Sequence, residues 1–116
     1  NITLPAAAIT FFDIDTGKDG KRSVEYVKIA KGYNSYWLTN STELNVTHDS
    51  YGDVIFTATV EGTGDDNPTD PLQLTVQQKN RAVAVDYQNV DHFIFELGAS
   101  EGKTARVFPF SVRPAL

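Results

Sequence analysis

Short runs of alternating apolar and polar residues recur along most of the chain, and this pattern constrains the fold more than any other feature. Alternate side chains of a β-strand point to opposite faces of its sheet, so the apolar members of each run are predicted to face a core. The apolar residues of the three clearest runs are Val54, Phe56, Ala58 and Val60; Phe93, Phe95 and Leu97; and Phe108, Phe110 and Val112.

Clusters of Gly, Asp, Asn and Pro separate these runs, as is typical of strands joined by turns. We predict hairpins at Asp19-Gly20 and at Tyr51-Gly52-Asp53, because glycine adopts a positive φ without a steric clash. The expected strands lie near residues 2–7, 9–15, 23–30, 34–39, 42–48, 53–60, 82–88, 91–97 and 104–112.

The segment 71–80 departs from the strand pattern. Thr75 and Gln78 have the spacing of a capping box, which predicts one short helical turn. An earlier start, with Asp70 as the N-cap and Pro71 as the first helical residue, is equally allowed. Many short strands with one helical crossover predict an all-β fold, a two-sheet antiparallel sandwich of the immunoglobulin-like or jelly-roll kind.

Composition excludes several classes of function. The 116 residues suffice for one core, and the lack of cysteine excludes zinc–thiolate sites, thiol nucleophiles and a disulfide scaffold. A net charge of −5 disfavours nucleic acid as a partner, and no apolar run is long enough for membrane insertion. Because the chain begins at Asn1 and contains no methionine, we expect a processed piece of a precursor.

Catalytic motifs are weak. The stretch Gly98-Ala99-Ser100-Glu101-Gly102 matches the G-x-S-x-G pattern of hydrolases, but a strand rather than a helix is expected to follow it, which favours a hairpin loop. The two histidines, His48 and His92, are expected to be ordinary, partly exposed strand residues. No nucleophile, base and orienting group can be assembled from these residues, so we predict that the protein is not an enzyme.

Two acidic loops are candidates for calcium binding. Asp13, Asp15 and Asp19 alternate along a glycine-containing turn, and Asp65 and Asp66 lie in a second acidic loop. Carboxylate oxygens in a flexible loop suit Ca²⁺, although the spacing is not that of an EF-hand. Ordinary turn chemistry, in which Asp bonds its own backbone, explains the same residues. No cofactor is required, and bound Ca²⁺ stays a hypothesis.

The strand expected at 34–39 is rich in aromatic residues. Tyr33 and Trp37 would share one face, and Tyr36 and Leu38 the other, so one set is predicted to point outward, where it can stack on a sugar ring. The competing interpretation places Trp37 in the core. The candidate N-glycosylation sites are Asn1, Asn40 and Asn45.

The opening segment alternates in one phase and then switches to the opposite phase. A strand cannot change face without a bulge or a break, so we predict a break within the alanine run. Residues 1–8 are therefore interpreted as an N-terminal arm, a candidate donor strand, and residues 9–116 as a single β-sandwich domain. The residues of the first phase are Ile2, Leu4, Ala6 and Ala8, and those of the second are Ile9 and Phe11.

An apolar arm of this kind pairs within its own sandwich, stays in solvent, or completes the sheet of a neighbouring subunit. Solvent is disfavoured because Ile2 and Leu4 would remain wet. Pro5 complicates pairing, since it lacks a backbone donor and is tolerated only where its nitrogen faces away from a partner strand. The residue pattern leaves self-pairing and donation equally open.

With this alternating arm, an all-β remainder and no catalytic residues, the chain resembles the immunoglobulin-like subunits of extracellular fibres that assemble by donor-strand exchange, as chaperone-assembled pilins do. The resemblance implies no enzyme activity, an extracellular or cell-surface location, and a partner identical to itself. The chain departs from pilins of the chaperone–usher class by lacking their Cys pair and by having Pro5 inside the arm.

The leading hypothesis is therefore a structural protomer of an extracellular helical fibre or pilus-like filament. In this hypothesis the arm residues Ile2, Leu4, Ala6 and Ala8 fill a groove in another copy. The alternative is a calcium-dependent carbohydrate-binding or adhesion module, with Trp37 or Tyr33 as the stacking platform. The expected partners are further copies of the chain or, in the alternative, glycans.

Overall fold

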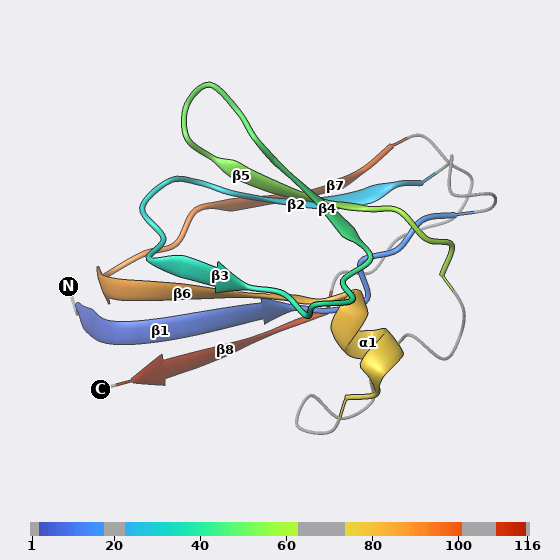
Figure 1. Ribbon diagram of the computed structural model, residues 1–116. Helices are drawn as coiled ribbons and strands as arrows, with labels where there is room; N and C mark the ends of the chain where they lie inside the picture. Colours follow the sequence, from blue (N-terminus) through green and yellow to red (C-terminus); the bar gives the residue numbers. More distant parts are fainter. Residues whose placement is uncertain (1–2, 18–22, 63–73, 101–108, 116) are drawn as a thin grey trace.

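The computed structural model describes residues 3–17, 23–62, 74–100 and 109–115 (Figure 1). The alternating runs form strands, as the sequence predicts, and the capping-box segment forms the helix. In chain order the elements are β1 (Leu4–Phe11), β2 (Glu25–Ile29), β3 (Ser35–Trp37), β4 (Leu44–His48), β5 (Val54–Ala58), α1 (Val76–Asn80), β6 (Val83–Val90), β7 (Phe95–Ala99) and β8 (Phe110–Ala115).

The strands form two four-stranded antiparallel sheets, ordered β3-β6-β1-β8 and β4-β5-β2-β7. The two sheets lie one above the other in Figure 1, with α1 beside one end. The predicted all-β, two-sheet architecture with one short helix is thus confirmed.

The core lies between the two sheets because the alternating apolar residues face inward. Ile9 and Val85 of one sheet and Val27 and Phe56 of the other are almost completely buried. Aromatic rings join the sheets: the Phe11 and Phe95 ring centroids are 5.2 Å apart, and those of Tyr36 and Phe56 are 5.0 Å apart.

The helix begins where the sequence predicts. The Thr75 hydroxyl accepts the Gln78 N–H at 3.2 Å, and the Gln78 side chain accepts the Thr75 N–H at 3.0 Å. Both bonds of the capping box are therefore present, and Val76 is the first helical residue. Asp70 and Pro71, the alternative start, lie outside the described residues.

One of the predicted hairpins is present and the other is not. The Tyr51-Gly52-Asp53 turn joins β4 to β5 as predicted, with Gly52 at φ 92°. Asp19 and Gly20 lie outside the described residues, and the flanking strands β1 and β2 belong to different sheets, so these two strands do not form the predicted hairpin. The hairpin predicted at Gly98–Gly102 is not formed by β7 and β8 either, since they also belong to different sheets; Glu101 and Gly102 lie outside the described residues.

The predicted break in the alanine run does not interrupt the first strand. β1 is continuous from Leu4 to Phe11 and so merges the strands expected at 2–7 and 9–15. Its register is constant along β6, from Leu4 opposite Val90 to Phe11 opposite Val83. The change of phase is accommodated without a bulge, because Leu4, Ala6 and Ala8 stay on the outer face of the sheet.

Candidate functional site

The candidate site is the terminal strand pair, defined as β1 and β8. β1 lies inside its sheet and pairs on both sides: Ala6 is opposite Gln88 of β6 and Ala115 of β8. Within the described residues, β8 pairs with β1 alone. Figure 1 shows the two strands side by side, with both chain ends at the same side of the molecule.

The two faces of β1 differ sharply. Ala7, Ile9 and Phe11 point into the core and are at most 5% exposed. Of the predicted donor face, Ala6 is exposed and Leu4 and Ala8 are half-buried on the outside of the sheet, while Ile2 lies outside the described residues. In a single chain, therefore, residues 4–8 pair in cis, and the side that anchors β1 is the one carrying Ile9 and Phe11.

Backbone parity shows on which side of β1 the Pro5 nitrogen lies. The Phe12 N–H donates to the Pro109 carbonyl at 3.0 Å, which fixes the even-numbered residues of β1 as those that bond β8. Pro5 therefore directs its nitrogen, which carries no hydrogen, toward Asn89 of β6, so the expectation that this nitrogen faces away from a partner strand is wrong. The ladder omits this one pair, and Asn89 adopts φ 52°. The irregularity is confined to one position and leaves the rest of the ladder in register.

The inner face of β8 is not covered as the sequence predicts. Phe110 contacts Phe11 and Phe95 at centroid distances of 6.0 and 6.1 Å, so its ring faces the core side. Nevertheless Phe110 is 50% exposed and Val112 is 43% exposed. The prediction that these two residues face the core side is therefore confirmed, but they are left about half exposed there; Phe108 lies outside the described residues.

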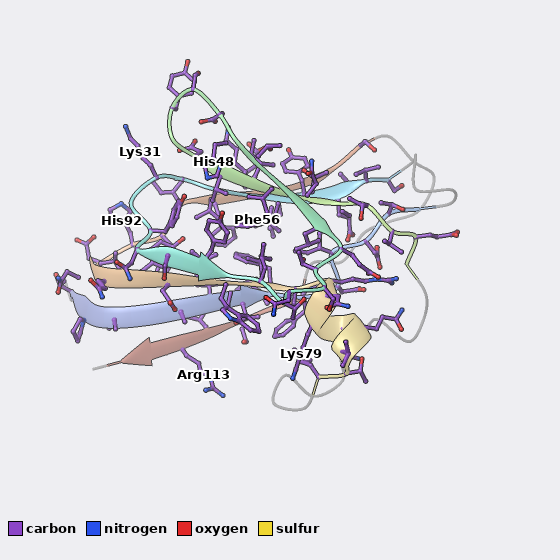
Figure 2. The ribbon with its side chains drawn as sticks, in the orientation of Figure 1. Lys31, His48, Phe56, Lys79, His92 and Arg113 are labelled. Carbon is purple, nitrogen blue, oxygen red and sulfur yellow. The ribbon has the colours of Figure 1, made fainter. Side chains whose placement is uncertain are left out.

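A shallow groove of about 350 Å³ lies along β1 and β6. The residues that line it are Ala6, Ala7 and Ala8 of β1, Asp86, Tyr87 and Gln88 of β6, Asn34, and Arg113 of β8. Ala8 has Asp86 of β6 on one side and Arg113 of β8 on the other, and Figure 2 shows Arg113 beside β8. The outer face of β1 therefore carries small alanine side chains, with the negative charge of Asp86 on one side and the positive charge of Arg113 on the other.

The segment that follows β1 connects it to the body of the protein. Asp13 has φ 56°, a conformation that Asp tolerates better than most residues. The Ile14 N–H donates to the Arg81 carbonyl at 3.0 Å, and the Asp15 N–H donates to the Glu25 carboxylate at 3.0 Å. Asp15, Glu25 and Arg81 are each at most 5% exposed, so this connection is anchored by buried polar groups.

The calcium hypothesis is tested only in part by the described residues. Asp13 and Asp15 lie in the connection after β1, whereas Asp19, Asp65 and Asp66 lie outside the described residues. Within the part of the chain that the structure describes, no three acidic, His or Cys side chains form a cluster suited to a metal ion. Calcium binding by the two acidic loops therefore stays a prediction.

The three catalytic candidates, Ser100, His48 and His92, do not form a catalytic group: Ser100 has a structural role, and the two histidines lie in separate segments. The Ser100 hydroxyl accepts the Val24 N–H at 2.9 Å, and the Ser100 N–H donates to the Val24 carbonyl, so this serine extends the β2–β7 ladder. His48 and His92 are exposed and belong to separate segments (Figure 2). His92 Nδ1 lies 2.6 Å from the Asp91 carboxylate.

The aromatic strand divides between the core and the surface. Tyr36 packs on Phe56, and Tyr33 lies beside Tyr36 with ring centroids 6.1 Å apart. Trp37 is 61% exposed, so the interpretation of Trp37 as a core residue is wrong. It borders a small pocket of about 50 Å³ together with Thr10, Lys79 and Ala84.

Two of the three candidate glycosylation sites are accessible. Asn40 and Asn45 are both exposed, Asn45 in β4 and Asn40 in the turn before it. Asn1 lies outside the described residues. The accessible pair therefore meets the geometric requirement for modification.

No described helix has the length and apolar character needed to cross a bilayer. Comparisons with known protein families, with curated proteins and with solved structures gave no match for this chain. The class that the coordinates define is a two-sheet antiparallel β fold whose N-terminal strand lies inside one sheet.

Proposed function

We propose that the protein is a structural protomer of an extracellular fibre, in which β1 of one copy occupies the place between β6 and β8 of the next. The observation that supports this proposal is the position of β1. It is the first strand of the described chain, and it is paired with a strand on both sides.

Exchange of β1 preserves nearly every contact. Ile9 and Phe11 enter the same core, and the same pairs with β6 and β8 form, whether β1 comes from the same chain or from a neighbour. Contact energy thus differs little between the two states, and the protein concentration decides which one predominates. Because the donor strand and the acceptor slot are different surfaces, the contact builds an open filament when each copy donates β1 to the next copy, whereas reciprocal exchange between two copies would close a dimer.

The connection after β1 is where the two states would differ. In the closed monomer it turns back at Asp13, whose φ is 56°. In the exchanged state it would run on to a neighbouring copy, and Phe12 and Ile14, both buried at present, would be repositioned.

The extracellular location is part of the same proposal. Asn40 and Asn45 are exposed within acceptor sequons, which fits a chain that enters a glycosylating compartment. The groove over the alanine run leaves the outer face of β1 accessible in the single chain.

A pair of cysteines at the β1–β6 ladder tests the proposal, because the chain has no cysteine of its own. Thr10 is opposite Ala84 in a pair that carries no backbone hydrogen bonds between the two residues, so their Cα atoms are about 4.5 Å apart, within disulfide range. In the double variant Thr10→Cys/Ala84→Cys, oxidation of assembled protein is expected to give a ladder of linked chains on a denaturing, non-reducing gel.

The matched control is Lys28→Cys/Ile55→Cys, which places the same kind of pair between β2 and β5. Its disulfide is expected to stay within one chain under all conditions. Filaments seen by negative-stain electron microscopy whose disulfides between positions 10 and 84 are all intramolecular would contradict strand exchange, as would a protein that stays monomeric at high concentration.

A second candidate function rests on Trp37. An exposed tryptophan beside a small pocket suits stacking on a sugar ring, as in a carbohydrate-binding or adhesion module. Trp37 is the single tryptophan of the chain, so its fluorescence reports binding directly. Saturable changes on titration with glycans, lost in Trp37→Ala and changed by added Ca²⁺ or chelator, would favour this function over the fibre.

A further inference from the structure

Within the described residues, the edge of β8 that faces away from β1 has no neighbouring strand; this edge is called the free edge of β8. Backbone parity from the Phe12–Pro109 bond directs the N–H and C=O groups of Ser111 and Arg113 toward β1. Those of Phe110 and Val112 then point to the free side, where the described chain places no strand. Unpaired groups on an edge strand are a template for another strand.

The side chains of this edge are apolar as well. Phe110 and Val112 lie on the inner face and keep 50% and 43% of their surface exposed. A strand added beside β8 would cover both of them while pairing their backbone groups. The other edge of the same sheet, β3, has only three residues and offers no comparable row.

We propose that the β8 strands of two copies pair antiparallel about a two-fold axis at Ser111. In this register Phe110 of each copy lies opposite Val112 of the other, and both pairs exchange backbone hydrogen bonds. Aromatic and β-branched residues opposite one another form favourable cross-strand pairs. The β3-β6-β1-β8 sheet of one copy then continues into the same sheet of the other copy, so that the dimer has one continuous sheet across its interface.

The hydrogen-bonding groups of the β8 edge favour pairing with β8 of a second copy. Only Phe110 and Val112 offer complete donor and acceptor sets on the free side, because Pro114 there lacks an N–H. The two-fold register uses those two residues and leaves Pro114 outside the bonded pairs. Arg113 is the only charged residue of β8, and it lies opposite Pro109 of the other copy, so no two charges meet.

This pairing goes beyond strand exchange and does not depend on it. It requires only that β8 be held by some β1, whether from its own chain or from a neighbour. Cysteines at positions 10 and 84 report exchange, whereas a cysteine at position 111 reports β8 pairing, so the two proposals fail separately.

The test is the single variant Ser111→Cys. At the two-fold axis the two introduced cysteines form a pair without backbone hydrogen bonds, about 4.5 Å apart at Cα, which suits a disulfide. The control is Ser35→Cys, an exposed serine in the opposite edge strand of the same sheet. Under mild oxidation, Ser111→Cys is expected to form the disulfide dimer at least about tenfold faster than the control.

A second pair of variants addresses the apolar edge. Val112→Lys directs a charge to the inner face of an edge strand, and is expected to weaken self-association by at least about tenfold in sedimentation velocity. Val76→Lys, at another exposed valine, is expected to leave it unchanged. Circular dichroism and the melting temperature show whether each variant folds.

Rapid disulfide dimerisation of Ser111→Cys together with the selective loss of association in Val112→Lys supports the pairing. Equal rates for Ser111→Cys and Ser35→Cys overturn it, as does association that Val112→Lys leaves intact in a chain whose β1 is held in cis by an intramolecular disulfide between positions 10 and 84. Association that Val112→Lys abolishes, without any disulfide dimer of Ser111→Cys, also overturns it, because a different strand or another protein would then occupy the edge.

Discussion

The central strands of the β4-β5-β2-β7 sheet and the terminal strand pair have the same alternating pattern but different surroundings. Val27, Ile29, Val54 and Phe56, on β2 and β5, are completely buried. On β8, Phe110 and Val112 occupy equivalent inward positions but keep about half of their surface exposed.

The number of neighbouring strands, rather than the residue type, causes this difference in exposed surface. β2 and β5 each have a strand on both sides, whereas β8 has one strand beside it in the described chain. Alternation thus identifies a strand and its inward face, but it does not show whether anything covers that face. Apolar residues left open at a chain end are a sign of an interaction surface.

Hydrogen exchange should show the largest contrast between the two regions. The amides of Val27 and Phe56 lie in ladders at the centre of a sheet, whereas those of Phe110 and Val112 face the free edge. At concentrations too low for association, exchange at Phe110 and Val112 is expected to be at least about a thousandfold faster. Slowing of these two amides as the concentration rises would locate the interface. Strong protection in a dilute monomer would show that the edge is already covered.

Truncation of one phenylalanine in each region should give a smaller contrast. Phe56→Ala empties a completely buried site and is expected to lower the free energy of unfolding by about 3–5 kcal/mol. Phe110→Ala removes a half-exposed ring, and about 1–2 kcal/mol is expected in the monomer. Urea denaturation of dilute protein measures both, and losses of equal size would contradict an open β8 face.

The smallest effect on stability is expected at the surface of the β4-β5-β2-β7 sheet, in the turn that joins β4 to β5. Partial burial raises the pKa of the Asp49 carboxyl. The N–H groups of Asp53 and Tyr51, which donate to this carboxylate, and the Lys28 ammonium, 3.2 Å from it, lower the pKa by more. The net effect is a pKa below the usual 3.8. Asp49 therefore contributes stability above its unfolded pKa, and this contribution is lost as the pH falls below about 4. In Asp49→Asn the stability of the folded protein should depend less on pH in this range. An unchanged pH profile would show that these bonds do not persist in solution.

The sequence predicts the elements of this fold better than their connections. Alternation identified the strands, and the Thr75–Gln78 spacing identified the helix cap, because both are local signals. Whether a turn closes a hairpin or crosses between sheets depends on distant pairing. The turns before β2 and after β7 were therefore predicted wrongly.

The terminal strand pair shows the same limit at the candidate site. The change of phase near Ala7 predicted a break, yet the alanine side chains are small enough to remain on an outer face without one. The one sequence signal for an edge position of β8 is Pro114, because proline within a sheet is confined mainly to edge strands. The sequence left the orientation of Trp37 open, because alternation alone does not distinguish the inner from the outer face of a short strand; the structure shows that it is exposed.

The antiparallel register of β1 and β8 also determines how the molecule responds to tension. Ala6 lies opposite Ala115, so both ends of the chain leave the sheet at the same side (Figure 1). Pulling the two ends of a single chain apart loads the ladder from that side and opens its pairs one after another, which needs little force. A β1 seated in a neighbouring copy would instead be pulled along its own axis, so the bonds on both of its sides would share the load and yield together.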